Sequence, residues 1–137
     1  MIKNVVALQE VQDSWRGVEA LRGKLQRAHL GSFAQGGSSA IFAADAAHNL
    51  PFIHACAVLN DVLEQLQREG HFHCKTIFLG ALLDASKAKL PWTDFAMIQE
   101  LTARRKDVAH RGDVIPRKDC WRYIDAIKAE LLAWSIL

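Results

Sequence analysis

The sequence predicts an all-α protein, folded as an up-and-down bundle of four to five helices. Over most of the chain, apolar residues recur three and four positions apart, which is the period of an amphipathic helix. Almost no segment alternates between apolar and polar residues as a half-buried strand does. Glycine, proline and short polar residues separate the periodic segments. The 137 residues suffice for one hydrophobic core, so we expect a single helical domain spanning residues 1–137.

The first helix is predicted to be long. Residues Val5 to Ala28 carry apolar side chains on one face and charges on the other. The following segment, Gly31 to Ser39, has the composition of a loop, and Ser38 or Ser39 can cap a short helical stretch that runs through His48.

A new helix is predicted to start at Asn49. Asparagine is a favoured N-cap residue, and Pro51 then stands in the first turn, where its missing N–H costs least. The apolar stripe continues from Phe52 to Glu69, and Gly70 is typical of a helix end.

The second half of the chain predicts three further helices. The segment from Lys75 to Lys87 carries apolar residues on nearly every side, so we expect it to lie centrally in the core. Thr93 or Asp94 can cap an amphipathic helix that ends at Gly112. A last amphipathic helix runs through Trp134.

Composition favours a soluble globular protein. Half of the residues are hydrophobic and 23% are charged, and the net charge is only +2. A charge this small does not by itself indicate nucleic-acid binding, although basic residues gather between Arg104 and Arg111. No secretory segment or membrane-spanning run is recognisable, so we expect a cytoplasmic protein with no membrane partner.

Neither a disulfide framework nor a metal site is expected. The three cysteines are widely spaced and form no Cys-x-x-Cys pair, which is typical of thiols in a reducing compartment. His71-x-His73-Cys74 offers possible metal ligands, but no second pair stands nearby in the sequence. No motif for a cofactor is recognisable either, so none is expected.

Arg105 is the residue that calls for a functional explanation. On a helical wheel it falls near the middle of the apolar stripe of its helix. Arginine is rarely buried without a partner, so we expect it to meet a carboxylate, a second subunit or an anionic ligand. The purely structural alternative is an ion pair, for which the sequence offers three carboxylates: Asp61, Glu64 and Asp84.

His110 follows Arg105 after four intervening residues and precedes Arg111-Gly112. This Arg-x4-His motif, late in a helical bundle, resembles the HEPN superfamily, whose signature is an arginine and a histidine four to six residues apart. Arg104 gives a second register. Arg22 and His29, with six residues between them, and Arg68 and His73, with four, also fit the signature. Only the late motif has the helical context and the Val-Ala-His-Arg-Gly ending of the family.

The resemblance implies a metal-independent RNA endonuclease of toxin or phage-defence type. Arg105 would hold the scissile phosphate and His110 would act as general acid or base, with RNA as the substrate. Four neighbouring residues are candidates for substrate binding: Arg104, Lys106, Asp107 and Arg111.

The resemblance also implies a homodimer whose two motifs share one cleft, and an antitoxin or other protein that restrains the activity. Five residues along a helix rotate by about 140°, so Arg105 and His110 are expected to face one site only if the helix distorts or a second subunit completes it. Two alternatives remain. His110 can serve as a cation at the helix C-terminus, and the bundle can be a non-catalytic binding, antitoxin, immunity or adaptor module.

Overall fold

The computed structural model describes the backbone of residues 1–28 and 37–137 and the side chains of residues 1–27 and 45–137. The described residues are all-helical or in connecting segments, which confirms the predicted helical bundle. The helices, in chain order, are α1 (Val5–Ala28), α2 (Gly37–Arg68), α3 (Leu79–Ser86), α4 (Phe95–Arg111) and α5 (Arg117–Ala133).

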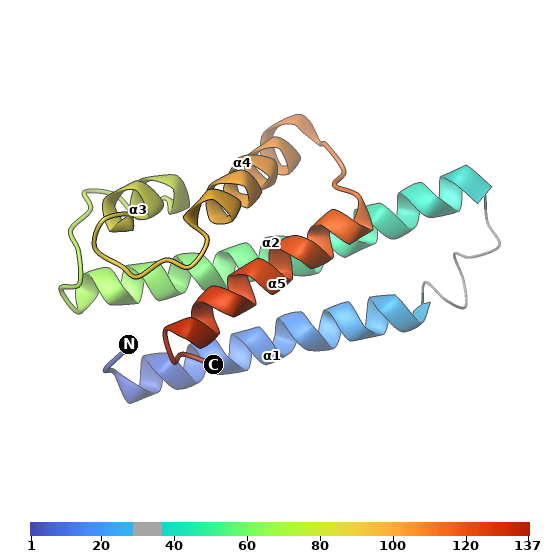
Figure 1. The fold of residues 1–137 in the computed structure, drawn as a ribbon. Helices are drawn as coiled ribbons and strands as arrows, with labels where there is room; N and C mark the ends of the chain where they lie inside the picture. Colours follow the sequence, from blue (N-terminus) through green and yellow to red (C-terminus); the bar gives the residue numbers. More distant parts are fainter. Residues whose placement is uncertain (29–36) are drawn as a thin grey trace.

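Helix α2 is the centre of the bundle. It contacts each of the other four helices, and Figure 1 shows α1 along one side of it, α3 and α4 along the other, and α5 in front. The core around it is apolar, and among its fully buried side chains are Phe52, Leu59, Leu63, Ile98, Tyr123 and Ile127. In the described part of the chain, no helix is both long enough and apolar enough to span a bilayer.

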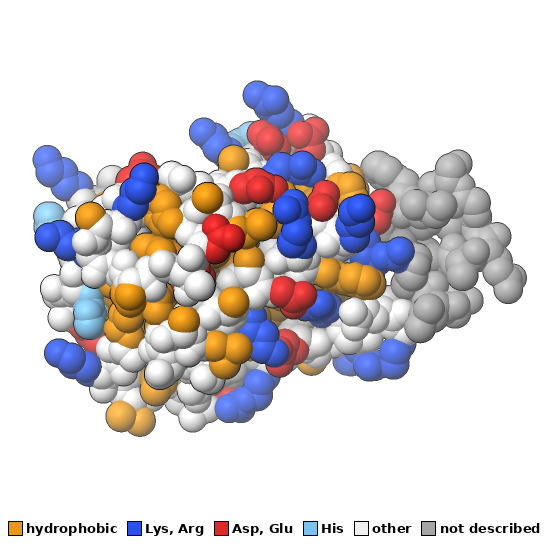
Figure 2. All heavy atoms as spheres, in the orientation of Figure 1, with side chains coloured by type: hydrophobic (Ala, Val, Ile, Leu, Met, Phe, Trp, Pro, Cys, Tyr) orange, Lys and Arg blue, Asp and Glu red, His pale blue; other side chains and the backbone are white. Residues whose placement is uncertain are grey.

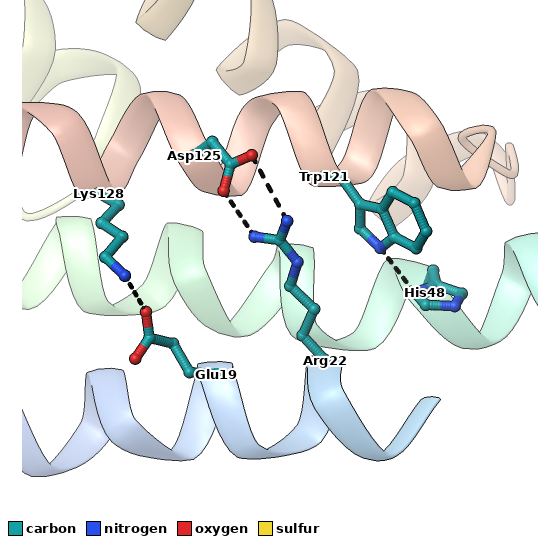
Figure 3. A network of polar contacts seen from close by, with 6 residues as sticks. All are labelled: Glu19, Arg22, His48, Trp121, Asp125 and Lys128. Atoms are coloured by element: carbon teal, nitrogen blue, oxygen red, sulfur yellow. Dashed lines mark hydrogen bonds and ion pairs between the residues drawn. The ribbon is translucent and has the colours of Figure 1, made fainter. Parts of the chain in front are cut away.

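Helix α1 has the predicted bounds, Val5–Ala28. Asn4 caps it, because its side-chain oxygen accepts hydrogen bonds from the N–H groups of Val6 (3.0 Å) and Ala7 (3.2 Å). Two ion pairs then tie α1 to α5, between Arg22 and Asp125 at 2.6 Å and between Glu19 and Lys128 (Figure 3). These contacts join helices far apart in the sequence.

Glu69, just beyond α2, holds the start of α1. Its carboxylate oxygens accept hydrogen bonds from the backbone N–H groups of Lys3 (2.8 Å) and Asn4 (2.9 Å), and from Gln65 Nε2 (2.8 Å). Burial alone would raise the pKa of Glu69, but these hydrogen bonds, with the nearby His71, outweigh it and lower the pKa to about 2.

Glu69→Gln is expected to lower the free energy of unfolding at neutral pH by roughly 1–3 kcal/mol, because the charged acceptor is lost. The folded-state pKa of about 2 lies below the ordinary pKa of a glutamate carboxyl, 4.5. The ionised carboxylate therefore stabilises the fold above about pH 4.5, and this contribution is lost as the pH falls toward 2. Denaturant unfolding at several pH values should show the variant and the wild type converging in acid. This role is contradicted if the difference in unfolding free energy between Glu69→Gln and the wild type stays constant with pH. It is also contradicted if Glu10→Gln, on the exposed side of α1, has an equal effect.

Helix α2 is continuous, so the helix start predicted at Asn49 is wrong. Pro51 lies inside the helix, and Asn49 is buried and bonded elsewhere. Its Nδ2 donates to the carbonyls of Asp45 (2.7 Å) and Ile115 (2.9 Å), and its Oδ1 accepts from the Ile115 N–H (3.0 Å). These bonds fasten the connection between α4 and α5 to α2 and engage the amide that a cap would use.

The segment before α2 is described only in part. The predicted loop from Gly31 to Ser39 lies outside the described residues up to position 36, and Gly37 to Ser39 already belong to α2. The side chains of Ser38 and Ser39, and with them the predicted cap, also lie outside the described residues.

Helix α3 is shorter and less buried than predicted. It runs from Leu79 to Ser86 and not from Lys75 to Lys87, and Phe78 at its N-cap has an extended backbone (φ −74°, ψ 134°). Ile77 and Phe78, expected in the core, are 63% and 75% exposed. Both residues precede the helix, and the side that the helix buries is formed by residues such as Leu82 and Leu83.

Helix α4 begins and ends at the predicted signals. The Asp94 side chain caps it by accepting from the Met97 N–H at 3.0 Å, and Gly112 ends it with a left-handed φ of +67°. The buried Glu130 carboxylate of α5 accepts further hydrogen bonds from the N–H groups of Thr93 and Asp94, at 2.7–3.0 Å. The start of α4 is therefore fastened to α5.

Candidate functional site

A cleft of about 590 Å³ opens where α2, α3 and α4 meet. Its walls come from one face of α2, from the first turn of α3 with the two residues before it, and from the second half of α4. The side chains with polar or charged groups along it are Asn60, Asp61, Glu64, Thr102, Arg105, Lys106 and His110.

Arg105 and His110 line this same cleft. Helix α4 remains α-helical through Arg111, so no distortion of the helix brings the two side chains together. One chain with a regular α4 therefore brings both residues to one cleft, whereas completion of the site by a second subunit stays a prediction. The cleft is broad enough for two side chains about 140° apart on α4 to border it.

Arg105 is half-buried and has no anionic partner among the described residues. Its Nε is shielded from solvent and makes no hydrogen bond. Asp61 and Glu64 line the same cleft without forming an ion pair with it, and Asp84 is exposed on α3 outside the cleft. The structural explanation for Arg105, an ion pair with one of these carboxylates, is therefore wrong.

The Cys56 thiol lies within electrostatic range of Arg105. Burial raises the pKa of Cys56 to about 12, although the positive charge of Arg105 acts in the opposite direction. The thiol is therefore protonated at neutral pH and is not a nucleophile.

The other four candidate residues divide between the cleft and its surroundings. Lys106 is exposed and lines the cleft. Arg104 does not line the cleft, and its charge acts on Glu100 of α4 and on Tyr123 of α5. Asp107 and Arg111 form an ion pair at 3.9 Å and do not line the cleft. Of the two possible motif arginines, Arg105 lines this cleft together with His110, and Arg104 does not.

The α2 wall of the cleft is acidic, a feature that residue spacing in the sequence does not reveal. The Glu64 carboxylate accepts hydrogen bonds from Asn60 Nδ2 (2.7 Å) and from Arg68 (3.1 Å). Burial and the neighbouring Glu64 raise the pKa of Asp61, against the attraction of Arg68 and His54. The wall opposite the cations thus carries two carboxylates.

The N-terminus of α3 also faces the cleft. Leu79, Gly80 and Ala81 form its first turn and line the cleft, and no side chain caps them because the N-cap residue is Phe78. The first N–H groups of a helix have no intrahelical acceptor and carry partial positive charge, which suits an anion. The sequence contains no capping residue that marks this start, so the feature could not be found from local signals.

Away from the cleft, charge is mixed. Figure 2 shows basic and acidic side chains interspersed over α4 and α5 on the face drawn, with no surface of one sign. In the described part of the chain, no three or more histidine, cysteine or acidic side chains are grouped so that they could hold a metal ion.

Comparison with models of protein families, with curated proteins and with solved structures finds no match for this chain. The resemblance to the HEPN superfamily therefore depends on the Arg-x4-His motif and its place late in a helical chain.

Proposed function

We propose that the protein is a HEPN-type, metal-independent RNA endonuclease. One observation carries this proposal: the half-buried Arg105, which has no partner among the described residues, shares a cleft with His110. An arginine held without a carboxylate is suited to a phosphate, whose oxygens its planar guanidinium bonds in pairs. Histidine exchanges protons near neutral pH, which suits transfer to and from the ribose and leaving-group oxygens.

The reaction follows from these two groups. The ribose 2′-oxygen loses its proton to a base and attacks the adjacent phosphorus, while the bond from phosphorus to the 5′-oxygen breaks and that oxygen gains a proton. His110 serves as base or acid, and Arg105 stabilises the charge that grows on the phosphate oxygens. Lys106 and the uncapped first turn of α3 support the same anion. The products carry 2′,3′-cyclic phosphate and 5′-hydroxyl ends.

The decisive experiment is cleavage of a mixed RNA pool by purified protein in EDTA, with the product ends mapped. We expect cleavage that leaves cyclic phosphate ends. An inert wild type would overturn the nuclease proposal and favour the non-catalytic binding module.

A homodimer and a restraining partner belong to the same proposal, because an unchecked ribonuclease would harm its own cell. Light scattering after size exclusion, at micromolar concentration, measures the mass of the assembly. A monomer that still cleaves RNA would remove the second subunit from the proposal, since one chain already brings Arg105 and His110 to one cleft.

Gly80→Asp is expected to lower the rate of RNA cleavage at least tenfold without loss of stability. A Cβ at Gly80 meets nothing within 4 Å, and an acidic side chain in the first turn favours the helix. The same carboxylate repels a phosphate that approaches the α3 N-terminus, a change comparable to loss of one donor to the developing charge.

Gly80→Asn is the matched comparison, since it fills the same space without the charge. Cleavage rates and thermal unfolding of both variants should be measured together. Equal cleavage rates for the two would show that charge at this turn does not matter, and would remove the α3 N-terminus from the phosphate site.

A further inference from the structure

The acidic α2 wall has no role in holding a phosphate. Asp61 is exposed along the cleft and makes no hydrogen bond to any described residue, whereas the nearby Glu64 is engaged by Asn60 and Arg68. Carboxylates repel an RNA backbone, so a bound strand places its phosphate on the α4 side. A nucleotide held there by its phosphate can reach Asp61 on the α2 wall with its base.

Two exposed apolar side chains that line the cleft offer a surface for a base. Phe78 is 75% exposed, and its extended backbone places it before the helix and not within a packed helical face. Ile77 beside it is 63% exposed. Single-stranded RNA is bound by stacking of unpaired bases on aromatic side chains and by hydrogen bonds to their Watson–Crick edges.

We propose that the cleft selects an unpaired guanine, which stacks on Phe78 and donates hydrogen bonds to Asp61. This inference depends on the proposed RNA substrate. An ionised carboxylate only accepts hydrogen bonds, and guanine presents two adjacent donors, N1–H and the 2-amino group. Adenine and cytosine place an acceptor nitrogen beside their amine, and uracil has one N–H between two carbonyls, so a carboxylate meets repulsion on each. The cleft of about 590 Å³ is of a size typical for sites that hold a small molecule.

The test is binding of 2′-O-methyl oligouridines with one central guanosine, inosine, adenosine or uridine, measured by fluorescence anisotropy in EDTA. The wild-type protein cannot cleave these probes, because the attacking hydroxyl is blocked. We expect the guanosine probe to bind roughly tenfold tighter than the uridine probe, with inosine between them because it lacks the 2-amino group.

Three variants test which residues cause the preference for guanosine. Asp61→Asn should bring the ratio of guanosine to uridine affinity close to one, and Phe78→Ala should weaken all four probes by about fivefold or more. Asp84→Asn is the matched control, since Asp84 is an exposed carboxylate on α3 outside the cleft, and it should keep the wild-type ratio.

The outcomes separate this inference from the nuclease proposal. Equal binding of all four probes by the wild type, or an unchanged ratio in Asp61→Asn, would overturn guanine selection even if RNA is cleaved. A guanosine preference that Asp61→Asn removes, without cleavage of ordinary RNA, would support the inference and overturn only the nuclease. If Phe78→Ala changes the mass of the assembly and not the affinities, Phe78 belongs to an interface between copies, and stacking is overturned.

Discussion

Arg105→Ala is expected to lower the single-turnover rate of RNA cleavage by about 10²- to 10³-fold, the effect of removing one group that stabilises the developing charge. The same change should leave the thermal unfolding midpoint unchanged or slightly raised. Arg105 makes no ion pair with a described residue, and its buried Nε makes no hydrogen bond, so truncation removes an uncompensated cation and leaves no orphaned partner. Cleavage in EDTA and thermal unfolding measure the two quantities on one preparation.

Two further variants make this result interpretable. Arg105→Lys keeps the charge but loses the planar pair of donors, so we expect a rate between those of the wild type and Arg105→Ala. Arg16→Ala removes an exposed arginine that pairs with Asp13 on α1, far from the motif in sequence, and should cleave at the wild-type rate. Loss of stability in Arg105→Ala in step with loss of activity would mean that Arg105 is a structural residue.

The bounds of most helices could be predicted because their signals are local. The periodic stripe defines α1 to the residue, and Asp94 and Gly112 mark both ends of α4 through bonds and dihedral angles of their own. The helical wheel also gives the phase of α4, so the sequence alone predicts that Arg105 falls on the apolar side of this helix.

The sequence-based predictions are wrong where contacts between distant parts of the chain determine the structure. Asn49 has the residue type of a cap, but its amide bonds Ile115, 66 positions away, and α2 passes through Pro51 unbroken. The apolar residues before α3 were assigned to the core from their pattern, yet Phe78 has no helix to carry it inward.

The sequence likewise predicts only part of the candidate site. The wheel identified Arg105, but only the packing of α2 and α3 against α4 forms the opposite wall of the cleft. Because of that packing, Arg105 lines the cleft and Arg104 does not. The motif alone does not predict this difference. It also brings carboxylates and a helix N-terminus to the site, and neither follows from spacing in the sequence.

His110→Ala is expected to lower the cleavage rate by about 10²- to 10⁴-fold, the range of general acid–base catalysis. His110 is exposed in the last turn of α4 and makes no hydrogen bond to a described residue, so its removal should leave unfolding nearly unchanged. A general acid or base also shapes the pH dependence of the rate. The wild-type rate should therefore depend on pH, and the variant should lack the part of that dependence that His110 contributes.

Added imidazole distinguishes a chemical role from a positional one. The cleft is open to solvent at His110, so free imidazole can enter the space left by His110→Ala and exchange the proton in its place. We expect partial recovery of the cleavage rate that saturates with imidazole concentration, and no recovery in Arg105→Ala. If imidazole fails to restore His110→Ala while the protein remains folded, His110 serves only as a cation at the end of α4, and the proton must be transferred by another group.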